Sequence, residues 1–276
     1  MKERITITLE NSLINDIDER VDNVRIRNRS HAIELLLRKS LGLKSPKKAL
    51  ILAGGKGTRL RPITYEIPKP MVPVQGRPLI EHTISLLRKY DIRDIIVSVG
   101  YLGEKVKDYF GDGSKFGVNL EYVFEDEPLG TAGCLRLARD LLDESFIMFN
   151  GDNLVNIDLQ SLFNAHLKSK ALSTIALTTV DDPSSFGVAI LKGNKITRFI
   201  EKPEEPISRL INAGVYVLEP EVIDLVPEGP ASMEYDVFPQ VLDKSKLYGY
   251  PFEGQWLPTD NTERYEKAIR EWEGVT

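Results

Sequence analysis

Two segments of this chain carry residue types that suit phosphate chemistry. The first is Leu52-Ala53-Gly54-Gly55-Lys56-Gly57-Thr58-Arg59-Leu60, which follows the apolar run 49–51. Glycines have no Cβ, so a ligand can approach their backbone, and a strand that turns into a helix there directs N–H groups and a helix N-terminus toward an anion. Arg59 adds a planar positive group. In the second segment, Lys69 lies between Pro68 and Pro70, so it stands on stiff backbone and loses less freedom on meeting a ligand.

Two further segments place polar residues directly after apolar runs. Asn150-Gly151-Asp152 follows 146–149, and Glu201-Lys202-Pro203 follows 196–200. Open α/β sheets bind ligands at the carboxyl ends of their strands, and a carboxylate there is well placed to hold Mg²⁺. The alternative for Asp152 is an ordinary turn aspartate at a strand end.

The elements that must position these residues alternate between strands and helices. Strands are predicted at 48–53, 94–99, 119–124, 145–149, 172–180, 187–191, 196–200, 211–218 and 246–252. Helices are predicted at 78–90, 104–110, 131–142, 158–168, 220–226, 233–243 and 261–272. Such alternation indicates an α/β fold with a mostly parallel sheet covered by helices on both faces.

With these motifs in this order, residues 49–276 resemble the sugar-1-phosphate nucleotidyltransferases. The sequences of the motifs are most similar to those of the mannose-1-phosphate guanylyltransferases. The resemblance implies a Rossmann-like nucleotidyltransferase fold. It also implies an enzyme that joins a nucleoside triphosphate and a hexose 1-phosphate to give an NDP-sugar and pyrophosphate, with Mg²⁺ as cofactor. The three histidines, His31, His82 and His166, lie in predicted helices far from the motifs, and we interpret them as structural. We interpret the one cysteine, Cys134, as a small packed residue on a helix.

The resemblance also implies a role for each motif residue. Arg59 and Lys69 offset triphosphate charge, Lys202 guides the sugar phosphate, and Asp152 binds the metal. Gly151, Glu201 and Asn212 line the sugar pocket. The residues that contact the nucleotide are Leu52, Ala53, Gly54, Gly55, Gly57, Thr58, Glu125 and Gly130.

Glu125 bears on which base is accepted. The segment 125–133 matches the family's base-reading turn, and relatives that transfer thymidylyl or uridylyl groups tend to carry Gln at this position. A carboxylate only accepts hydrogen bonds, which suits the adjacent N1–H and N2–H donors of guanine and not the carbonyls of thymine or uracil. We expect GTP as donor. The alternative for Glu125 is that it faces solvent and that backbone groups alone read the base. The alternative substrates are glucose 1-phosphate and one of dTTP, UTP or CTP.

The second metal ligand departs from the family pattern. Many relatives have Trp-Leu-Asp-Ile-Gly, whereas this chain reads Trp256-Leu257-Pro258-Thr259-Asp260. Pro258 has no ligand atom, and Asp260 resembles the Trp-x-Pro-x-Asp arrangement of cytidylyltransferases. We assign Asp260 as the second carboxylate. The alternative is that Asp260 is the N-cap of the helix predicted at 261–272.

The charge distribution predicts two modules with different partners, and the alternative is that the basic part is a solvated terminal segment. Residues 1–48 carry 11 Lys/Arg and 7 Asp/Glu, a net charge of +4, and the rest carries −9. The single cysteine excludes an intrachain disulfide, the first 20 residues do not read as a signal peptide, and no apolar run approaches the ~20 residues of a membrane span. We expect a cytoplasmic protein without a membrane partner. The predicted domains are residues 1–43, a linker 44–48 and residues 49–276.

The basic module has the order strand, helix, helix. Residues 3–9 alternate polar and apolar, residues 11–22 form an amphipathic pattern, and Asn28 or Ser30 can cap a second helix that ends near Gly42. This β-α-α order resembles a ribbon-helix-helix DNA-binding domain, in which two chains pair their strands into a ribbon that enters the major groove of duplex DNA.

That resemblance implies a homodimer or higher oligomer, because about forty residues bury too little surface alone. Arg4, Thr6 and Thr8 would read base edges, and Arg29 and Ser30 would contact a phosphate. The alternative is a dimerisation arm without DNA affinity. For the whole chain, the alternative to an enzyme is a DNA-binding regulator whose large domain only senses sugar nucleotides.

Overall fold

The computed structural model describes residues 5–21, 26, 28–40 and 44–275. Contacts divide the chain into two compact units, Met1–Ser45 and Pro46–Thr276. No helix in the described part of the chain is long and apolar enough to cross a membrane.

The described residues of the smaller unit form two helices, α1 (Asn11–Asp18) and α2 (Arg29–Ser40). Asn28 caps α2, because its Oδ1 accepts a hydrogen bond from the backbone N–H of His31 at 2.9 Å. The two helices are in contact, and Ile17 of α1 and Ala32 of α2 are buried. Gly42, where the second helix was expected to end, lies outside the described residues.

In the described part of the strand predicted at 3–9, residues 5–9, no strand forms in the single chain. Residues 5–10 have no strand hydrogen bonding, and Ile5 and Ile7 are 69% and 50% exposed. A strand exists only through hydrogen bonds to a neighbouring strand, and none of the described residues of this unit offers one. The predicted base-reading residues Thr6 and Thr8 are exposed in this segment, whereas Arg4 lies outside the described residues.

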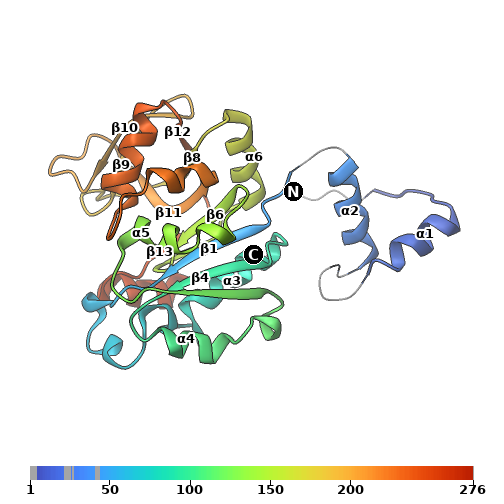
Figure 1. Cartoon of the computed structure of the whole chain (residues 1–276), viewed down its shortest axis with the longest axis horizontal. Helices are drawn as coiled ribbons and strands as arrows, with labels where there is room; N and C mark the ends of the chain where they lie inside the picture. The colour runs from blue at the N-terminus through green and yellow to red at the C-terminus, as the bar shows by residue number, and fades with distance from the viewer. Residues whose placement is uncertain (1–4, 22–25, 27, 41–43, 276) are drawn as a thin grey trace. The chain divides into compact units, whose positions relative to one another are not determined.

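Nine strands form one mixed sheet in the larger unit. They are β1 (Lys48–Ala53), β4 (Asp94–Val99), β5 (Asn119–Phe124), β6 (Phe146–Asn150), β8 (Ser173–Thr179), β9 (Gly187–Lys192), β10 (Lys195–Glu201), β11 (Leu210–Leu218) and β12 (Leu247–Pro251). Their order is β5-β4-β1-β6-β11-β8-β12-β10-β9. Figure 1 labels every strand of this sheet except β5. Each boundary lies within one residue of the predicted strand.

The prediction of a mostly parallel sheet is correct for only part of it. β5, β4, β1 and β6 run parallel, as do β8 and β12, but β11 is antiparallel to both β6 and β8. β9 and β10 are also antiparallel, because only Gly193 and Asn194 connect them and so short a turn can only reverse the chain. The parallel half of the sheet carries the glycine-rich turn.

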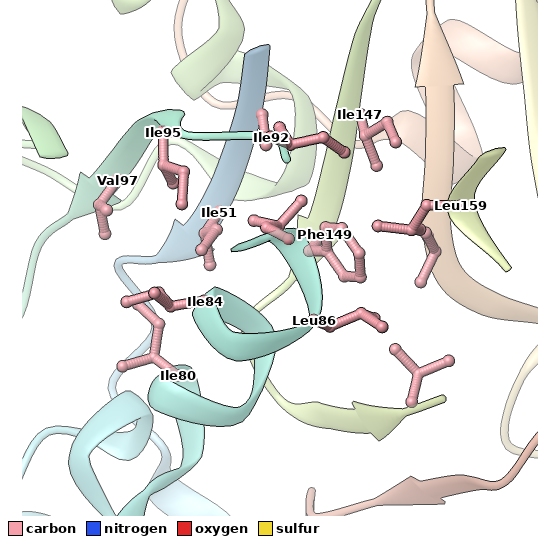
Figure 2. Packing of buried hydrophobic residues seen from close by; sticks show 14 of the residues in the cluster. Ile51, Ile80, Ile84, Leu86, Ile92, Ile95, Val97, Ile147, Phe149 and Leu159 are labelled. Atoms are coloured by element: carbon pink, nitrogen blue, oxygen red, sulfur yellow. The ribbon is translucent and has the colours of Figure 1, made fainter. Parts of the chain in front are cut away.

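Two apolar layers cover the faces of this sheet. Ile51 and Phe149 point into the first layer, with α3 (Leu79–Lys89), α4 (Gly103–Phe110) and α6 (Leu159–Ser169). Leu50 and Met148 point into the second, with α5 (Gly130–Leu137) and α7 (Phe238–Asp243). Figure 2 shows side chains of α3 packed beneath Ile51 and Phe149. Neighbouring residues of one strand alternate between faces, so continuous apolar runs are buried on both sides.

Several predicted helices take other forms. Residues Pro220–Leu225 form a 3₁₀ helix, and α7 is preceded by a π-helical turn at Met233–Val237. Sequence reasoning missed four short strands, β2 (Pro73–Val74), β3 (Arg77–Pro78), β7 (Asn153–Val155) and β13 (Trp256–Pro258). These strands have two or three residues each, too few for an alternating pattern to be visible.

Buried histidines and the cysteine have structural surroundings. His166 lies with Nε2 2.8 Å from Glu219 Oε1 and Nδ1 2.9 Å from Thr174 Oγ1. Burial raises the pKa of the Cys134 thiol to about 12, so it stays protonated and is a poor nucleophile. These placements agree with the structural interpretation of His166 and Cys134.

His82 is expected to make stability depend on pH. Its Nδ1 accepts from Trp272 Nε1 at 3.1 Å, so it is neutral with its proton on Nε2, 3.1 Å from Val74 O. Burial lowers the pKa of His82 below 6.5, so the unfolded state takes up a proton first. The free energy of unfolding should therefore fall as pH drops below 6.5. Urea unfolding at several pH values should show that the free energy of unfolding falls more steeply with decreasing pH for the wild type than for His82→Gln. An equal pH dependence in the two proteins would contradict this.

Candidate active site

A pocket of about 340 Å³ opens at the carboxyl ends of β1 and β6. It gathers all eight predicted nucleotide-contacting residues, both predicted metal ligands, and Arg59, Lys69 and Gly151. Its lining consists of Leu52, Ala53, Gly54, Gly55, Gly57, Thr58, Arg59, Lys69, Pro70, Glu125, Pro128, Gly130, Thr131, Asn150, Gly151, Asp152 and Asp260. Segments far apart in the sequence therefore meet at one site.

The glycine-rich turn differs from the expected strand-turn-helix unit. Gly57 adopts a left-handed conformation with φ of 60°, and its carbonyl accepts a hydrogen bond from Thr64 Oγ1 at 2.7 Å. The residues that follow form only a 3₁₀ turn, Thr58–Leu60, in place of an α-helix. Three residues align too few peptide dipoles to act as a helix N-terminus, so an anion at this turn would have to be held by the open loop backbone and Arg59.

A substitution at Gly55 can test contact with the ligand without disturbing the packing of the loop. A Cβ on Gly55 would meet no atom within 4 Å, whereas one on Gly54 would lie 2.5 Å from Glu125 Oε1. We expect Gly55→Ala to leave the melting temperature unchanged and to weaken triphosphate binding about tenfold or more, because the methyl group occupies space that the ligand needs. Calorimetric titration with the triphosphate checks this. Unchanged affinity would show that the ligand does not approach Gly55.

The two acidic residues converge because of a two-stranded ladder. β7 begins directly after Asp152, and β13 ends two residues before Asp260. The strands pair antiparallel with Pro258 opposite Asn153, so their ends lie together. Thr259 ties the two segments further, because its backbone N–H and Oγ1 donate to Asp152 O at 3.0 and 2.9 Å. Both carboxylates therefore face the same pocket.

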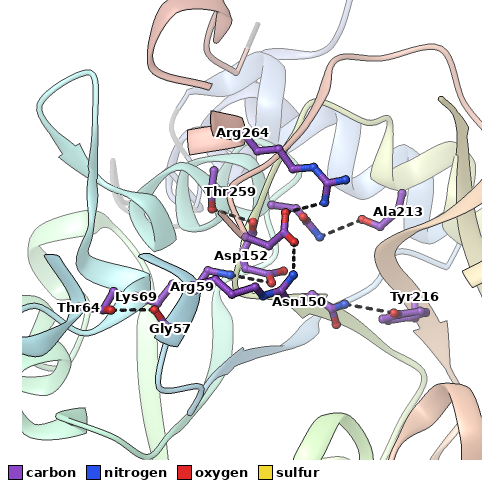
Figure 3. Close-up of polar contacts among 12 residues, drawn as sticks. Gly57, Arg59, Thr64, Lys69, Asn150, Asp152, Ala213, Tyr216, Thr259 and Arg264 are labelled. Atoms are coloured by element: carbon purple, nitrogen blue, oxygen red, sulfur yellow. Dashed lines mark hydrogen bonds and ion pairs between the residues drawn. The ribbon is translucent and has the colours of Figure 1, made fainter. Parts of the chain in front are cut away.

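Three cations hold these two carboxylates in the free protein. Lys69 Nζ lies 2.9 Å from Asp152 Oδ2, Arg59 NH1 lies 2.6 Å from Asp260 Oδ2, and Arg264 NH1 lies 2.9 Å from Asp260 Oδ1. Figure 3 shows Arg59, Lys69 and Arg264 around Asp152 at this site. Burial alone would raise the pKa of Asp260, but the hydrogen bond and charge of Arg264, with the charges of Arg59 and Lys69, hold it below its usual value. Asp260 is therefore ionised at neutral pH.

Asp260 is not the cap of the last helix, α8 (Thr262–Glu271). Asn261 is the cap residue, and its Oδ1 accepts a hydrogen bond from Arg264 N at 2.9 Å. The capping alternative for Asp260 is therefore wrong. Its carboxylate lines the pocket instead.

Glu125 faces the pocket and not the solvent. Its Oε1 accepts from Ser98 Oγ at 2.7 Å, and its Oε2 accepts from the backbone N–H of Leu129 at 3.0 Å. These contacts fix the carboxylate beside Gly54 and shape the turn that precedes α5. Each oxygen keeps a second lone pair for a ligand.

Of the predicted sugar-side residues, Gly151 lines the pocket, whereas Glu201, Lys202 and Asn212 lie outside its lining. Lys202 Nζ is 3.6 Å from Glu201 Oε1, and burial raises the pKa of Glu201. Asn212 donates to Tyr216 OH at 2.9 Å, and Asn150, which lines the pocket, approaches the same hydroxyl at 3.4 Å. Asn212 is thus connected to the pocket through Tyr216 and Asn150.

Four pocket residues and one neighbour were missed from the sequence. The pocket residues are Pro70, Pro128, Thr131 and Asn150. Each belongs to a segment that the sequence analysis had identified. The segment was therefore recognised, but this particular side chain was not assigned to the site. Arg264 could have been found from its spacing, because it stands four residues after Asp260, a separation that brings a carboxylate and an arginine together at a helix start.

In the smaller unit, the predicted phosphate contact Arg29 is engaged by its own chain. Arg29 NH2 lies 2.5 Å from Asp18 Oδ2, and the hydrogen bond from Arg29 lowers the pKa of Asp18. Ser30 is exposed at the start of α2. A phosphate that binds there would have to compete with Asp18 for Arg29.

Comparisons with known proteins agree with this geometry. A mannose-1-phosphate guanyltransferase of Yarrowia lipolytica is 41% identical over 219 residues, and a UTP–glucose-1-phosphate uridylyltransferase of Synechocystis is 39% identical over 245 residues. These matches cover 76% and 81% of this chain, which spans only 60% and 62% of those relatives. The structure of HddC from Yersinia pseudotuberculosis complexed with GMP-PN is similar with a TM-score of 0.70 at 26% identity, over 82% of this chain and 100% of that one. The nucleotidyl transferase family model matches residues 48–273, so the chain belongs to the nucleotidyl transferase family.

Proposed function

We propose that the chain transfers a nucleotidyl group from a nucleoside triphosphate to a hexose 1-phosphate, giving an NDP-sugar and pyrophosphate. The observation that supports this most is that the carboxylates of Asp152 and Asp260 meet two cations, Lys69 and Arg59, beside the glycine-rich turn. GTP and mannose 1-phosphate are the proposed substrates, supported by relatives named mannose-1-phosphate guanyltransferase.

The proposed reaction is a single displacement. An oxygen of the sugar phosphate attacks the α-phosphorus of the triphosphate, a new P–O bond forms, and the bond to the β-phosphate oxygen breaks as pyrophosphate leaves. Arg59 and Lys69 offset charge on the triphosphate, and Lys202 guides the attacking phosphate. Glu201, Asn212 and Gly151 would orient the sugar. No general base is needed, because a phosphate monoester is already largely ionised at pH 7.

Asp152 and Asp260 would hold Mg²⁺. The donor set fits, because Mg²⁺ commonly binds through one or two carboxylates and completes its shell with water and substrate phosphates. Within the described residues, no group of three or more His, Cys, Asp or Glu could form an all-protein cage. Bound Mg²⁺ would neutralise charge on the reacting phosphates. Arg59, whose side chain is 66% exposed, can exchange Asp260 for the triphosphate.

A pyrophosphate-release screen of GTP, dTTP, UTP and CTP against hexose 1-phosphates, with and without Mg²⁺, tests this function. We expect the highest kcat/KM with GTP and mannose 1-phosphate and no turnover without Mg²⁺. Glu125→Gln should lower the preference for GTP over UTP. Glucose 1-phosphate with dTTP, UTP or CTP is the alternative pair, and faster turnover of dTTP or UTP than of GTP would overturn the guanine assignment. Absence of turnover with every pair would favour a sugar-nucleotide sensor.

For the smaller unit we propose a ribbon-helix-helix fold that dimerises and binds duplex DNA. The exposed Ile5 and Ile7 support dimerisation, because pairing with a second copy would cover them. Arg4, Thr6 and Thr8 would then read base edges, with Arg29 and Ser30 at a phosphate. We place the protein in the cytoplasm, in keeping with its single cysteine.

DNA binding by the full-length chain is expected to be salt-sensitive. Fluorescence anisotropy with duplex DNA should show affinity that falls steeply between about 50 and 200 mM salt, because phosphate contacts release counterions. Arg4→Ala should weaken binding, and a chain that lacks residues 1–45 should not bind. If the full-length chain does not bind duplex DNA at low salt, the unit is a dimerisation arm only.

A further inference from the structure

The position of Asp260 raises the question of what orients its side chain. β13 ends at Pro258, and α8 begins at Thr262, so Asp260 lies in the turn between them. A residue within a strand is oriented by the ladder, but a turn residue receives no such constraint. Its orientation must therefore come from side-chain contacts, and the contacts found are Arg59 on Oδ2 and Arg264 on Oδ1.

The two arginines differ in how firmly they are held. The Arg59 side chain is 66% exposed on the glycine-rich turn, whereas that of Arg264 is 25% exposed. The Arg264 guanidinium lies 4.6 Å from the centre of the Phe186 ring, and its backbone N–H is bonded to Asn261. A cation packed on an aromatic face and carried by a capped helix loses little further freedom on holding a carboxylate. Arg264 is therefore the permanent partner, and Arg59 the exchangeable one.

We propose that Arg264 is a positioning residue that holds Oδ1 of Asp260 and thereby directs Oδ2 toward the metal. When Arg59 turns to the triphosphate, Oδ2 becomes available and Oδ1 stays fixed. Arg264 supplies in this turn the orientation that a strand ladder would supply to a carboxylate at position 258. The inference rests on the proposed function, because it requires that Asp260 binds Mg²⁺.

The direction in which metal affinity changes when Arg264 is removed distinguishes a positioning role from a purely electrostatic effect. A guanidinium 2.9 Å from Asp260 Oδ1 repels a divalent cation, so charge alone predicts tighter metal binding once Arg264 is removed. Positioning predicts weaker binding. A purely structural role predicts a lower melting temperature with unchanged metal affinity.

Mn²⁺ binding in the presence of GTP and without sugar phosphate, followed by electron paramagnetic resonance, tests the proposal. We expect Arg264→Met to raise the Kd for Mn²⁺ about 10- to 100-fold, as loss of a residue that supports a metal ligand typically does. Arg264→Lys should restore part of the affinity and covers the case in which Arg264→Met folds poorly. Lys267→Met is the matched control. Lys267 lies on the same helix and, together with Arg264, lines a second pocket of about 870 Å³, but it pairs with Glu271.

Each outcome decides one claim. An unchanged or lower Kd for Arg264→Met, with wild-type binding intact, would overturn the positioning role and leave the proposed function standing. A Kd that rises equally in Lys267→Met would also overturn it, because any cation on α8 would then suffice. If the wild type does not bind Mn²⁺ with GTP, or Asp260→Asn binds it as tightly as the wild type, the metal role of Asp260 fails and the inference fails with it.

Discussion

Asp260→Asn is expected to lower turnover at least about a hundredfold, because even residues that only support metal ligands cost 10–100-fold when lost. The variant keeps the shape of the side chain, removes its charge and replaces one of its two acceptor oxygens with an NH2 donor. In the structure that charge faces the pocket and is balanced by Arg59 and Arg264. The free energy of unfolding should change by less than about 1 kcal/mol, since both arginines can reach solvent. Steady-state kinetics and urea unfolding measure the two quantities.

Asn261→Ala is the matched control for Asp260→Asn. Asn261 is the neighbouring residue and caps α8, so its loss should cost about 1 kcal/mol of stability while turnover is retained. The two variants should thus show opposite patterns. Loss of stability without loss of turnover in Asp260→Asn would contradict the metal role of Asp260.

Lys69→Met is expected to lower kcat about 10²- to 10³-fold, in the range of losing one preorganised electrostatic contact to the transition state. The Lys69 side chain is only 13% exposed and its Nζ lies 2.9 Å from Asp152 Oδ2, so it is held at the pocket before substrate binds. Because both carboxylates remain, Mn²⁺ binding should persist in this variant. That result would separate Lys69 from Asp260, whose loss affects both metal binding and turnover.

Lys56→Met is the control for Lys69→Met. Lys56 belongs to the glycine-rich turn and is exposed, but it is not among the residues that line the pocket. Removing its charge should leave kcat nearly unchanged. If both lysine variants lost turnover equally, general positive charge near the turn would explain the effect, and the specific role of Lys69 would be wrong.

Local sequence pattern was sufficient for most strands of the fold. The apolar runs that became β1, β4 and β6 are buried on both faces, and such runs are visible without knowledge of their neighbours. Strand direction was less accessible, because an apolar run reads the same for either orientation. The antiparallel placement of β11 was therefore not visible in its residues.

The site was predictable as a set of motifs and not as a set of contacts. Glu125 and Gly130 were assigned to the nucleotide from one segment, and both line the pocket. The ladder of β7 and β13 was missed, although it is what brings Asp152 and Asp260 together. Three-residue strands form because Leu154 and Leu257 pack in one apolar cluster with Leu60, and that packing exists only in the folded chain.

The order of apolar runs, glycines and charged residues alone determined that residues 49–276 form an α/β unit with a glycine-rich turn after its first strand, because these patterns act through neighbours along the chain. The partners of the charged groups were decided by the tertiary structure. Arg59 meets Asp260 across 201 positions, and Asn261 takes the cap that Asp260 could have filled. Contacts of that kind depend on where packed strands and helices end in space, which no local spacing encodes.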